Sequence, residues 1–230
     1  MIFRGKEEKR LFFPVIHIFD PVLTLENTKI AIDAGANGVF LINHYSKITD
    51  LIHQRELVLN TFPDFWVGLN CLGVPLEHLF YIIPENVQGI WTDNAGISEY
   101  QTEQHLAKEI LFSQKETDWN GLYFGGVAFK YQEVQTDLCK VAKLAKNFMD
   151  VVTTSGERTG TPPKVSKILT MKYGVGSKPL AIASGITNKN INIYLPFVDC
   201  FLVSTGISDN AISLNENKTK ALGKAIKLYK

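Results

Sequence analysis

Polar residues able to do acid–base chemistry stand directly after short apolar runs of this sequence. Asn43, Asn70, Asp93 and Lys130 each follow such a run. Amides orient hydroxyl or carbonyl groups, whereas an aspartate and a lysine can exchange protons or carry charge. Together with Glu157, these residues are our candidates for a catalytic group. For any single one of them, a helix cap or a charge on the rim is the competing interpretation.

Three later segments combine small hydroxylated residues with glycine. Backbone N–H groups in such segments can converge on an anion, and the start of a helix adds partial positive charge. The alternative is that glycine and serine simply make tight turns. We expect this set to bind a phosphate group: Ser155, Gly156, Thr159, Gly160, Ser184, Gly185, Ser204, Thr205 and Gly206.

These residues can act together only if the chain brings the ends of several strands to one place. Short β-rich apolar runs alternate with longer amphipathic stretches, which is typical of parallel strands covered by helices. We predict eight strands: Phe13–Phe19, Gly38–Asn43, Phe65–Asn70, Gly89–Asp93, Leu122–Phe129, Asp150–Thr154, Pro179–Ala183 and Cys200–Ser204.

A helical stretch follows each predicted strand. Eight such units in 230 residues, with no linker, predict one (β/α)8 TIM barrel and a single domain over residues 1–230, since this fold takes about 250 residues. A doubly wound open sheet is the competitor, but its usual glycine-rich turn is replaced by Asp20-Pro21-Val22-Leu23 after the first strand. The predicted helices are Leu25–Ala34, Lys47–Asn60, Leu76–Ile83, Ser98–Ser113, Thr136–Phe148, Val165–Tyr173, Asn188–Leu195 and Asn217–Tyr229.

A barrel of this kind builds its active site at the carboxyl ends of its strands. We therefore expect Asn43, Asn70, Asp93 and Lys130 to form an arc that faces the phosphate loops. Lys130 should rise into the mouth beside Asp93, either as a rim charge or as a group that polarises a carbonyl or balances an oxyanion. The loops after strands seven and eight frequently hold phosphate in such barrels.

His17 lies inside the first predicted strand. A buried histidine satisfied by hydrogen bonds is the favoured interpretation, and a catalytic one is the alternative. The sequence has no HExxH motif and no clustered metal-ligand spacing, so we expect neither a protein-held metal nor a certain cofactor. A magnesium ion that bridges the substrate to Asp20 or Asp93 stays open as an alternative.

The charge balance excludes a strong overall field for nucleic acid or an acidic membrane, because 24 basic and 23 acidic side chains leave a net charge of +1. No apolar stretch reaches the roughly 18 to 20 residues that cross a bilayer, and the first ten residues do not form a secretion signal. Cys71, Cys139 and Cys200 fit neither a zinc motif nor a disulfide framework. We expect a cytoplasmic protein whose partner is a phosphorylated small molecule, with a homo-oligomer left open.

Four segments resemble the BtpA family, which includes SgcQ-type proteins: Gly38–Asn43, Val67–Leu72, Val127–Tyr131 and Ser155–Pro163. The similarity in order and spacing runs from about the first strand to the eighth, and the SG-x-x-TG-x-PP element is its most specific part. The resemblance implies a phosphate-binding TIM barrel. It also implies a nucleoside or sugar-phosphate enzyme in some members and a photosystem assembly factor in others.

The chain departs from that family at two places. His17 leads into Ile18-Phe19-Asp20-Pro21, where the family has a proline- and glycine-rich loop. The family often shows Glu-Asn after strand two and Lys-His after strand five, whereas this chain has Ile42-Asn43 and Lys130-Tyr131. The amide and the lysine are kept, but the acid and the histidine are not.

Two functions follow as hypotheses. The leading one is an enzyme acting on a sugar phosphate or ribosyl phosphate by isomerisation, lyase chemistry or glycosyl-bond cleavage, between which the fold does not choose. The second is a non-catalytic assembly or regulatory protein on the same scaffold. That function needs an exposed apolar patch, for which Phe62, Phe65 and Trp66 are the candidates.

Overall fold

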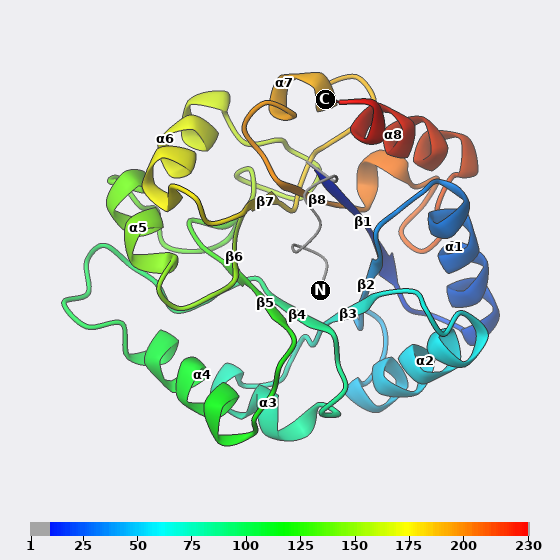
Figure 1. Cartoon of the computed structure of the whole chain (residues 1–230), viewed down its shortest axis with the longest axis horizontal. Coiled ribbons are helices and arrows are strands. Elements are labelled where there is room, and N and C mark those ends of the chain that lie inside the picture. The colour runs from blue at the N-terminus through cyan, green and yellow to red at the C-terminus, as the bar shows by residue number, and fades with distance from the viewer. Residues whose placement is uncertain (1–9, 230) are drawn as a thin grey trace.

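Eight parallel strands close into a barrel in the computed structural model, which describes residues 10–229 (Figure 1). Strands pair in chain order and β8 pairs with β1, which confirms the predicted (β/α)8 barrel. Residues 1–9 and 230 of the predicted domain lie outside the described residues. The strands are β1 (Leu11–His17), β2 (Val39–Ile42), β3 (Val67–Asn70), β4 (Gly89–Thr92), β5 (Leu122–Gly126), β6 (Val151–Thr154), β7 (Leu180–Ile182) and β8 (Cys200–Val203).

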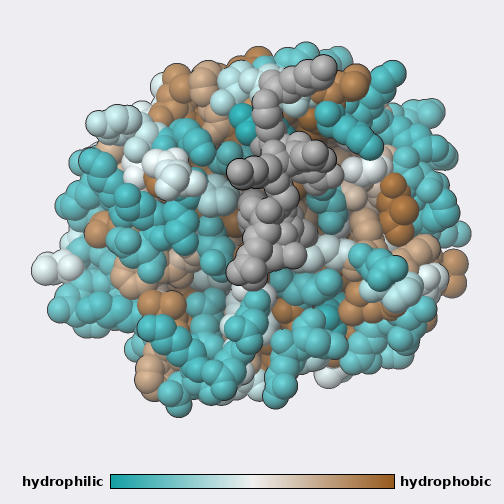
Figure 2. All heavy atoms as spheres, in the orientation of Figure 1, coloured by the Kyte–Doolittle hydropathy of each residue, from teal (hydrophilic) through white to brown (hydrophobic). Residues whose placement is uncertain are grey.

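The helices form a ring outside the strands (Figure 1). On the face seen in Figure 2, hydrophilic residues cover most of the outer rim and hydrophobic areas are small. No helix in residues 10–229 is long and apolar enough to cross a membrane. The helices are α1 (Pro21–Asp33), α2 (Ile48–Thr61), α3 (Leu79–Ile82), α4 (His105–Glu116), α5 (Leu138–Ala145), α6 (Val165–Val175), α7 (Ile191–Tyr194) and α8 (Glu216–Leu228), with 3-10 turns η1 (Leu76–His78) and η2 (Thr205–Ile207).

Aromatic side chains fill the inside of the barrel. The rings of Phe13 and Phe124 have centroids 5.8 Å apart, although β1 and β5 are not neighbours in the ring, so the two side chains meet across the interior. Phe40 packs edge-on against both. Such pairs contribute about 0.5–1.5 kcal/mol each beyond the area they bury. The interior is therefore a packed floor beneath the mouth.

The inner and outer cores follow the alternation of side chains along each strand. In β1, Phe13 and Val15 belong to the inner core, whereas Phe12 and Ile16 belong to the core under the helices. A residue two positions beyond the last inward residue of a strand therefore faces the mouth. This alternation decides which of the polar residues at the strand ends can meet.

The first strand and the first helix begin earlier than predicted. β1 runs from Leu11 to His17 rather than from Phe13 to Phe19. The Asp20 carboxylate accepts the backbone N–H of Leu23 at 3.0 Å, and Pro21 is the first residue of α1. An aspartate cap followed by proline is a helix-start signal, which the hydrophobic pattern alone does not contain.

The fifth strand ends earlier than predicted. β5 stops at Gly126 rather than at Phe129, because Ala128 has a φ of 47° and leaves the extended conformation. The fourth helix also begins later, at His105 rather than at Ser98. Both differences lengthen the loops on the mouth side of the barrel.

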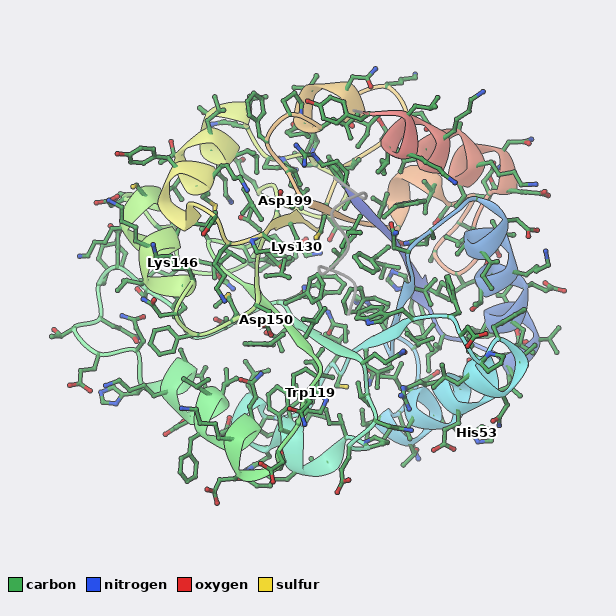
Figure 3. All side chains as sticks on the ribbon, in the orientation of Figure 1. His53, Trp119, Lys130, Lys146, Asp150 and Asp199 are labelled. Atoms are coloured by element: carbon green, nitrogen blue, oxygen red, sulfur yellow. The ribbon has the colours of Figure 1, made fainter. Side chains whose placement is uncertain are left out.

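Two aspartates tie neighbouring strands together at their amino ends. Asp150 precedes β6 and accepts the backbone N–H of Tyr123 in β5 at 2.9 Å. Asp199 precedes β8 and accepts the N–H of Leu180 at 2.9 Å and the Nζ of Lys172 at 2.6 Å. Figure 3 labels both aspartates. Because strands run from this end to the mouth, these contacts belong to the stability of the barrel and not to its candidate site.

Candidate functional site

A cluster of polar side chains lies at the mouth on the side of β1 to β5. His17, Asn70 and Asp93 continue the inward alternation of β1, β3 and β4. The Asn70 Nδ2 donates to the Asp93 Oδ1 at 3.3 Å. The Lys130 charge acts on both Asp93 and His17, and Figure 3 shows Lys130 near the centre of the ring of strands. The structure thus brings together Asn70, Asp93 and Lys130 from the predicted arc.

Asp93 is held at a raised pKa. Burial is the largest cause, because it disfavours the charged carboxylate. The charge of Lys130, the hydrogen bond from Asn70 and the charge of His44 oppose that effect. A raised pKa moves the titration of a carboxyl group toward the pH at which general acid–base catalysis is most effective.

His17 is a neutral imidazole at neutral pH. Burial, followed by the charges of His44 and Lys130, lowers its pKa to about 4. Its ring stacks on that of His44, with centroids 5.2 Å apart. The His17 Nδ1 is buried and has no hydrogen-bond partner among the described residues. The favoured interpretation of a histidine satisfied by hydrogen bonds therefore does not hold for this nitrogen.

Asn43 lies outside the cluster. Its Oδ1 accepts the backbone N–H of Leu72 at 2.7 Å, and its Nδ2 donates to the Leu72 carbonyl at 3.1 Å. Phe40 and Ile42 point inward in β2, so Asn43 falls on the other face and His44 takes the mouth position. Both residues follow the apolar run of β2 and our candidate set took only Asn43; the two-residue alternation is the signal that selects His44.

The loop that carries Lys130 is fixed by its neighbours. The Lys130 N–H donates to the Ser155 Oγ at 2.7 Å, and the Gln132 side chain donates to the Asp93 carbonyl oxygen. Ala128 and Tyr131 both have positive φ, at 47° and 63°. Such non-glycine conformations cost on the order of 1–3 kcal/mol each and persist only where the surroundings hold them. The backbone that places Lys130 is therefore held by contacts from two other loops.

The loops after β6, β7 and β8 converge on one another. A Cβ on Gly206 would lie 1.9 Å from the Ile186 carbonyl oxygen, so the β7 and β8 loops touch through backbone. Gly185 has a φ of 67°, and a Cβ there would lie 2.1 Å from the Pro162 nitrogen in the β6 loop. The Ser184 hydroxyl donates to the Arg158 carbonyl at 3.2 Å. Glycine is required at both close approaches.

Backbone donors remain unused where these loops meet. The N–H groups of Gly185, Ile186, Thr205 and Gly206 donate no hydrogen bond within residues 10–229. Thr205 and Gly206 open the 3-10 turn η2, whose first N–H groups have no partner within the turn. Loops of this kind can supply several N–H groups to one anion.

The remaining predicted phosphate residues differ in their availability. The Ser155 hydroxyl is buried, accepts the Lys130 N–H and donates to the Gly156 carbonyl at 2.8 Å, so it serves the loop itself. Thr159 is exposed and its hydroxyl lies 3.5 Å from that of Tyr131. Gly160 is exposed beside Thr205, and Ser204 continues the inward alternation of β8.

Glu157 and Asp20 lie apart from the polar cluster at the mouth. Glu157 is exposed on the β6 loop and forms an ion pair with Lys164 at 3.7 Å. Asp20 caps α1, so its carboxylate is already bound to Leu23. Within residues 10–229, no three His, Cys, Asp or Glu side chains lie together in a group that could hold a metal ion.

The fold and its mouth define a (β/α)8 barrel with a polar cluster on one side and glycine loops on the other. No protein-family model matches the chain, so the BtpA similarity stays a resemblance. An uncharacterized protein of Pyrococcus horikoshii, PH1209, is 28% identical over 81 residues, which cover 35% of this chain and 31% of that protein. The match thus spans about a third of the relative's length.

Solved structures of similar fold cover nearly the whole chain. Geranylgeranylglyceryl phosphate synthase from Thermoplasma acidophilum has a TM-score of 0.68 at 11% identity, over 99% of this chain and 97% of that one. Phosphoribosyl anthranilate isomerase from Thermus thermophilus has a TM-score of 0.67 at 12% identity, over 94% and 96%. Orotidine 5'-monophosphate decarboxylase from Methanocaldococcus jannaschii has a TM-score of 0.64 at 15% identity, over 97% and 100%. At these identities the likeness shows the fold alone.

Proposed function

We propose that this chain is an enzyme that acts on a small phosphorylated metabolite. The loops after β6, β7 and β8 hold the phosphate, and the reacting atoms lie beside His17, Asp93 and Lys130. The observation that carries the proposal is the set of unused backbone N–H groups at the junction of the β7 and β8 loops, on the same mouth as a titratable cluster.

The phosphate is held in this proposal mainly by backbone donors. Gly185, Ile186, Thr205 and Gly206 supply N–H groups, and hydrogen bonds to a charged oxygen are shorter and stronger than those to a neutral one. Arg158 lies exposed on the β6 loop, and its backbone carbonyl accepts the Ser184 hydroxyl, so this part of the β6 loop adjoins the β7 loop. The names of the three similar enzymes support this, since each includes a phosphate-bearing compound.

The roles of the polar cluster follow from its electrostatics. Asp93, with its raised pKa, is the proton carrier, and Asn70 orients it. Lys130 stabilises negative charge that develops on a substrate oxygen. His17 stays neutral, so it adds no positive charge beside Lys130. Isomerisation, lyase chemistry and glycosyl-bond cleavage all need a proton transfer of this kind.

Asn43 and Glu157 do not contact the reacting atoms in this proposal. Asn43 holds the β2 and β3 loops together, so it positions the mouth. Glu157 lies on the loop that also contributes to the phosphate site, and its carboxylate faces solvent. A loss of turnover on replacing either residue would move it into the reacting group.

Introducing a negative charge at Thr205 tests the phosphate site. Calorimetric titration with inorganic phosphate and with sn-glycerol 1-phosphate measures affinity for wild type, Thr205→Asp and Thr205→Asn. Thr205 is exposed, so neither substitution disturbs the packing. We expect Thr205→Asp to weaken binding at least about tenfold by like-charge repulsion, and Thr205→Asn to change it less than about threefold. Equal affinity for wild type and Thr205→Asp would refute the site.

The substrate itself is found by native mass spectrometry after incubation with pooled cell metabolites. A phosphorylated molecule retained by wild type and lost by Thr205→Asp is the expected result. The assembly-protein hypothesis has no support from the residues it needs. Phe62, Phe65 and Trp66 are partly buried and pack against the cores, so they do not form the exposed patch.

A further inference from the structure

A cavity lies beside the mouth, between the β5–α5 loop and the β6–α6 loop. It has a volume of about 580 Å³ and is closed on one side by the first turns of α6. Its lining includes Tyr131 and Leu138 from one loop and helix, and Lys164, Lys167 and Thr170 from the other. None of the lining residues comes from the β7 or β8 loop, but Lys130, Ser155 and Gly156 line it, so the cavity adjoins the proposed site on its β6 side.

Lys167 reaches from α6 into this cavity with its amine half-buried. Its Nζ donates to the Ala128 carbonyl at 2.5 Å and to the Ser155 carbonyl at 2.8 Å. The two carbonyls lie just after the carboxyl ends of β5 and β6. No carboxylate forms an ion pair with this Nζ within residues 10–229.

The two hydrogen bonds leave one direction at the nitrogen unused. A neutral amine has two N–H donors and one lone pair, whereas an ammonium has three donors. The two carbonyls take two donors, so a neutral Lys167 has its lone pair in the remaining tetrahedral direction. Because Lys167 lines the cavity, a molecule inside it lies next to this side chain.

Burial favours the neutral amine. It lowers the pKa of Lys167 to about 8, against an opposing effect of the Glu157 charge. At pH 7.5 about a quarter of such amines are neutral, compared with about one in a thousand at an ordinary lysine pKa of about 10.4. A desolvated lysine of this kind is the form that proteins use as a nucleophile toward carbonyl carbon.

We propose that this cavity is a binding site for small aldehydes or ketones, in which Lys167 forms an imine with the carbonyl carbon. The nitrogen lone pair forms a C–N bond and the carbonyl oxygen becomes a hydroxyl, which gives a carbinolamine. That hydroxyl, whose proton came from the amine, then takes one proton from solvent and leaves as water, which gives a protonated imine, so no oxidant or reductant is consumed.

The charges around the cavity fit a neutral carbonyl compound. With Lys167 neutral, the charged side chains of the lining are Lys130 and Lys164 on one hand and Glu133 and Glu157 on the other. Lys164 and Glu157 already pair at 3.7 Å. The lining therefore carries no net charge, and the ligand does not need an anionic group to enter.

Reductive trapping of wild-type protein tests the proposal. Limiting propionaldehyde with cyanoborohydride at pH 7.5 converts any imine into a stable propyl-lysine, which peptide mass spectrometry assigns to a residue. Lys164 is the matched control, because it lines the same cavity but its side chain is 81% exposed. We expect labelling of Lys167 to be at least about tenfold faster than that of Lys164. A larger fraction of Lys167 is neutral amine, which raises the rate of labelling. The gain is smaller than the ratio of the neutral fractions, because a less basic amine is also a weaker nucleophile.

The pH dependence and one variant complete the test. Labelling of Lys167 should level off above about pH 8, whereas an ordinary lysine is still gaining neutral amine at pH 9. Lys167→Arg keeps both carbonyl contacts and should remove the fast label. Labelling of Lys167 no faster than that of Lys164 would overturn the proposal. The label does not depend on the β7 and β8 loops, so failure here leaves the phosphate proposal intact, and the reverse also holds.

Discussion

The two sides of the barrel mouth are built from different chemical groups. On the side of β1 to β5, His17, Asp93 and Lys130 present titratable side chains whose charge states depend on burial and on one another. On the side of β6 to β8, backbone N–H groups and close-packed glycines such as Gly185 and Gly206 make the surface. In the proposed function, the first side transfers a proton and the second binds the phosphate.

This difference has a consequence for mutation. A side chain in the polar cluster can be replaced while the barrel keeps its shape, because it lies at a strand end above the packed aromatic floor. A glycine where two loops touch cannot, because any side chain meets backbone that does not move freely. Substitutions in the polar cluster should therefore lower activity with little loss of stability. Substitutions at the glycines where two loops touch should lower both.

The largest effect is expected at Lys130. Lys130→Met should cut turnover at least about a hundredfold, the lower range for loss of one acid–base or electrostatic group, while stability and phosphate affinity stay near wild type. Turnover of the substrate identified by mass spectrometry is measured, with Lys164→Met as the control on the outer rim. Near-normal turnover would make Lys130 a rim residue and remove the central member of the cluster.

A large effect on both properties is expected at Gly206. Gly206→Ala places a Cβ 1.9 Å from the Ile186 carbonyl oxygen. We expect the free energy of unfolding in urea to fall by about 1–3 kcal/mol, as for an overpacked site, and phosphate affinity to fall with it. Thr205→Ala, at the exposed neighbour, should change stability by less than about 0.5 kcal/mol. A stable Gly206→Ala protein with full phosphate affinity would contradict the proposed packing of these loops.

A smaller effect with a characteristic pH range is expected at His17. Its folded pKa of about 4 lies below the ordinary value of 6.5, so the unfolded chain binds more protons between these values. The stability that this group contributes is present above pH 6.5 and is lost as pH falls through about 4. We expect wild type to lose about 1–2 kcal/mol more than His17→Asn over this range, after allowance for partial solvent screening. Parallel stability curves for the two proteins would show that His17 is not buried as described.

The smallest effect is expected at Glu157. Its ion pair with Lys164 spans 3.7 Å between two largely exposed side chains, so Glu157→Gln should change the free energy of unfolding by less than about 0.5 kcal/mol. The turnover of the same variant shows whether Glu157 belongs to the group of residues that react with the substrate. Turnover lowered tenfold or more would extend the reacting group across to the β6 loop.

Sequence reasoning located the strand ends better than the side chains that meet there. Asn70, Asp93 and Lys130 were placed in one cluster by their position after apolar runs, and the structure brings them together. Of the two residues after the second strand, Asn43 was chosen and His44 was left out, because the choice used nearness to the strand end and not the two-residue alternation. The end of β5 was missed because Ala128 adopts a positive φ without being glycine.

The sequence by itself determined the eight βα units, the closed barrel and the glycine loops after the last three strands. Hydrophobic periodicity and turn residues act locally, so they can be read from neighbouring positions. Only the tertiary structure decided that His17 is neutral, that Asp93 has a raised pKa and that Lys167 lies in a cavity. Each of these depends on burial and on charges from residues far away in the chain, and the electrostatic environment of a group exists only once the barrel has closed.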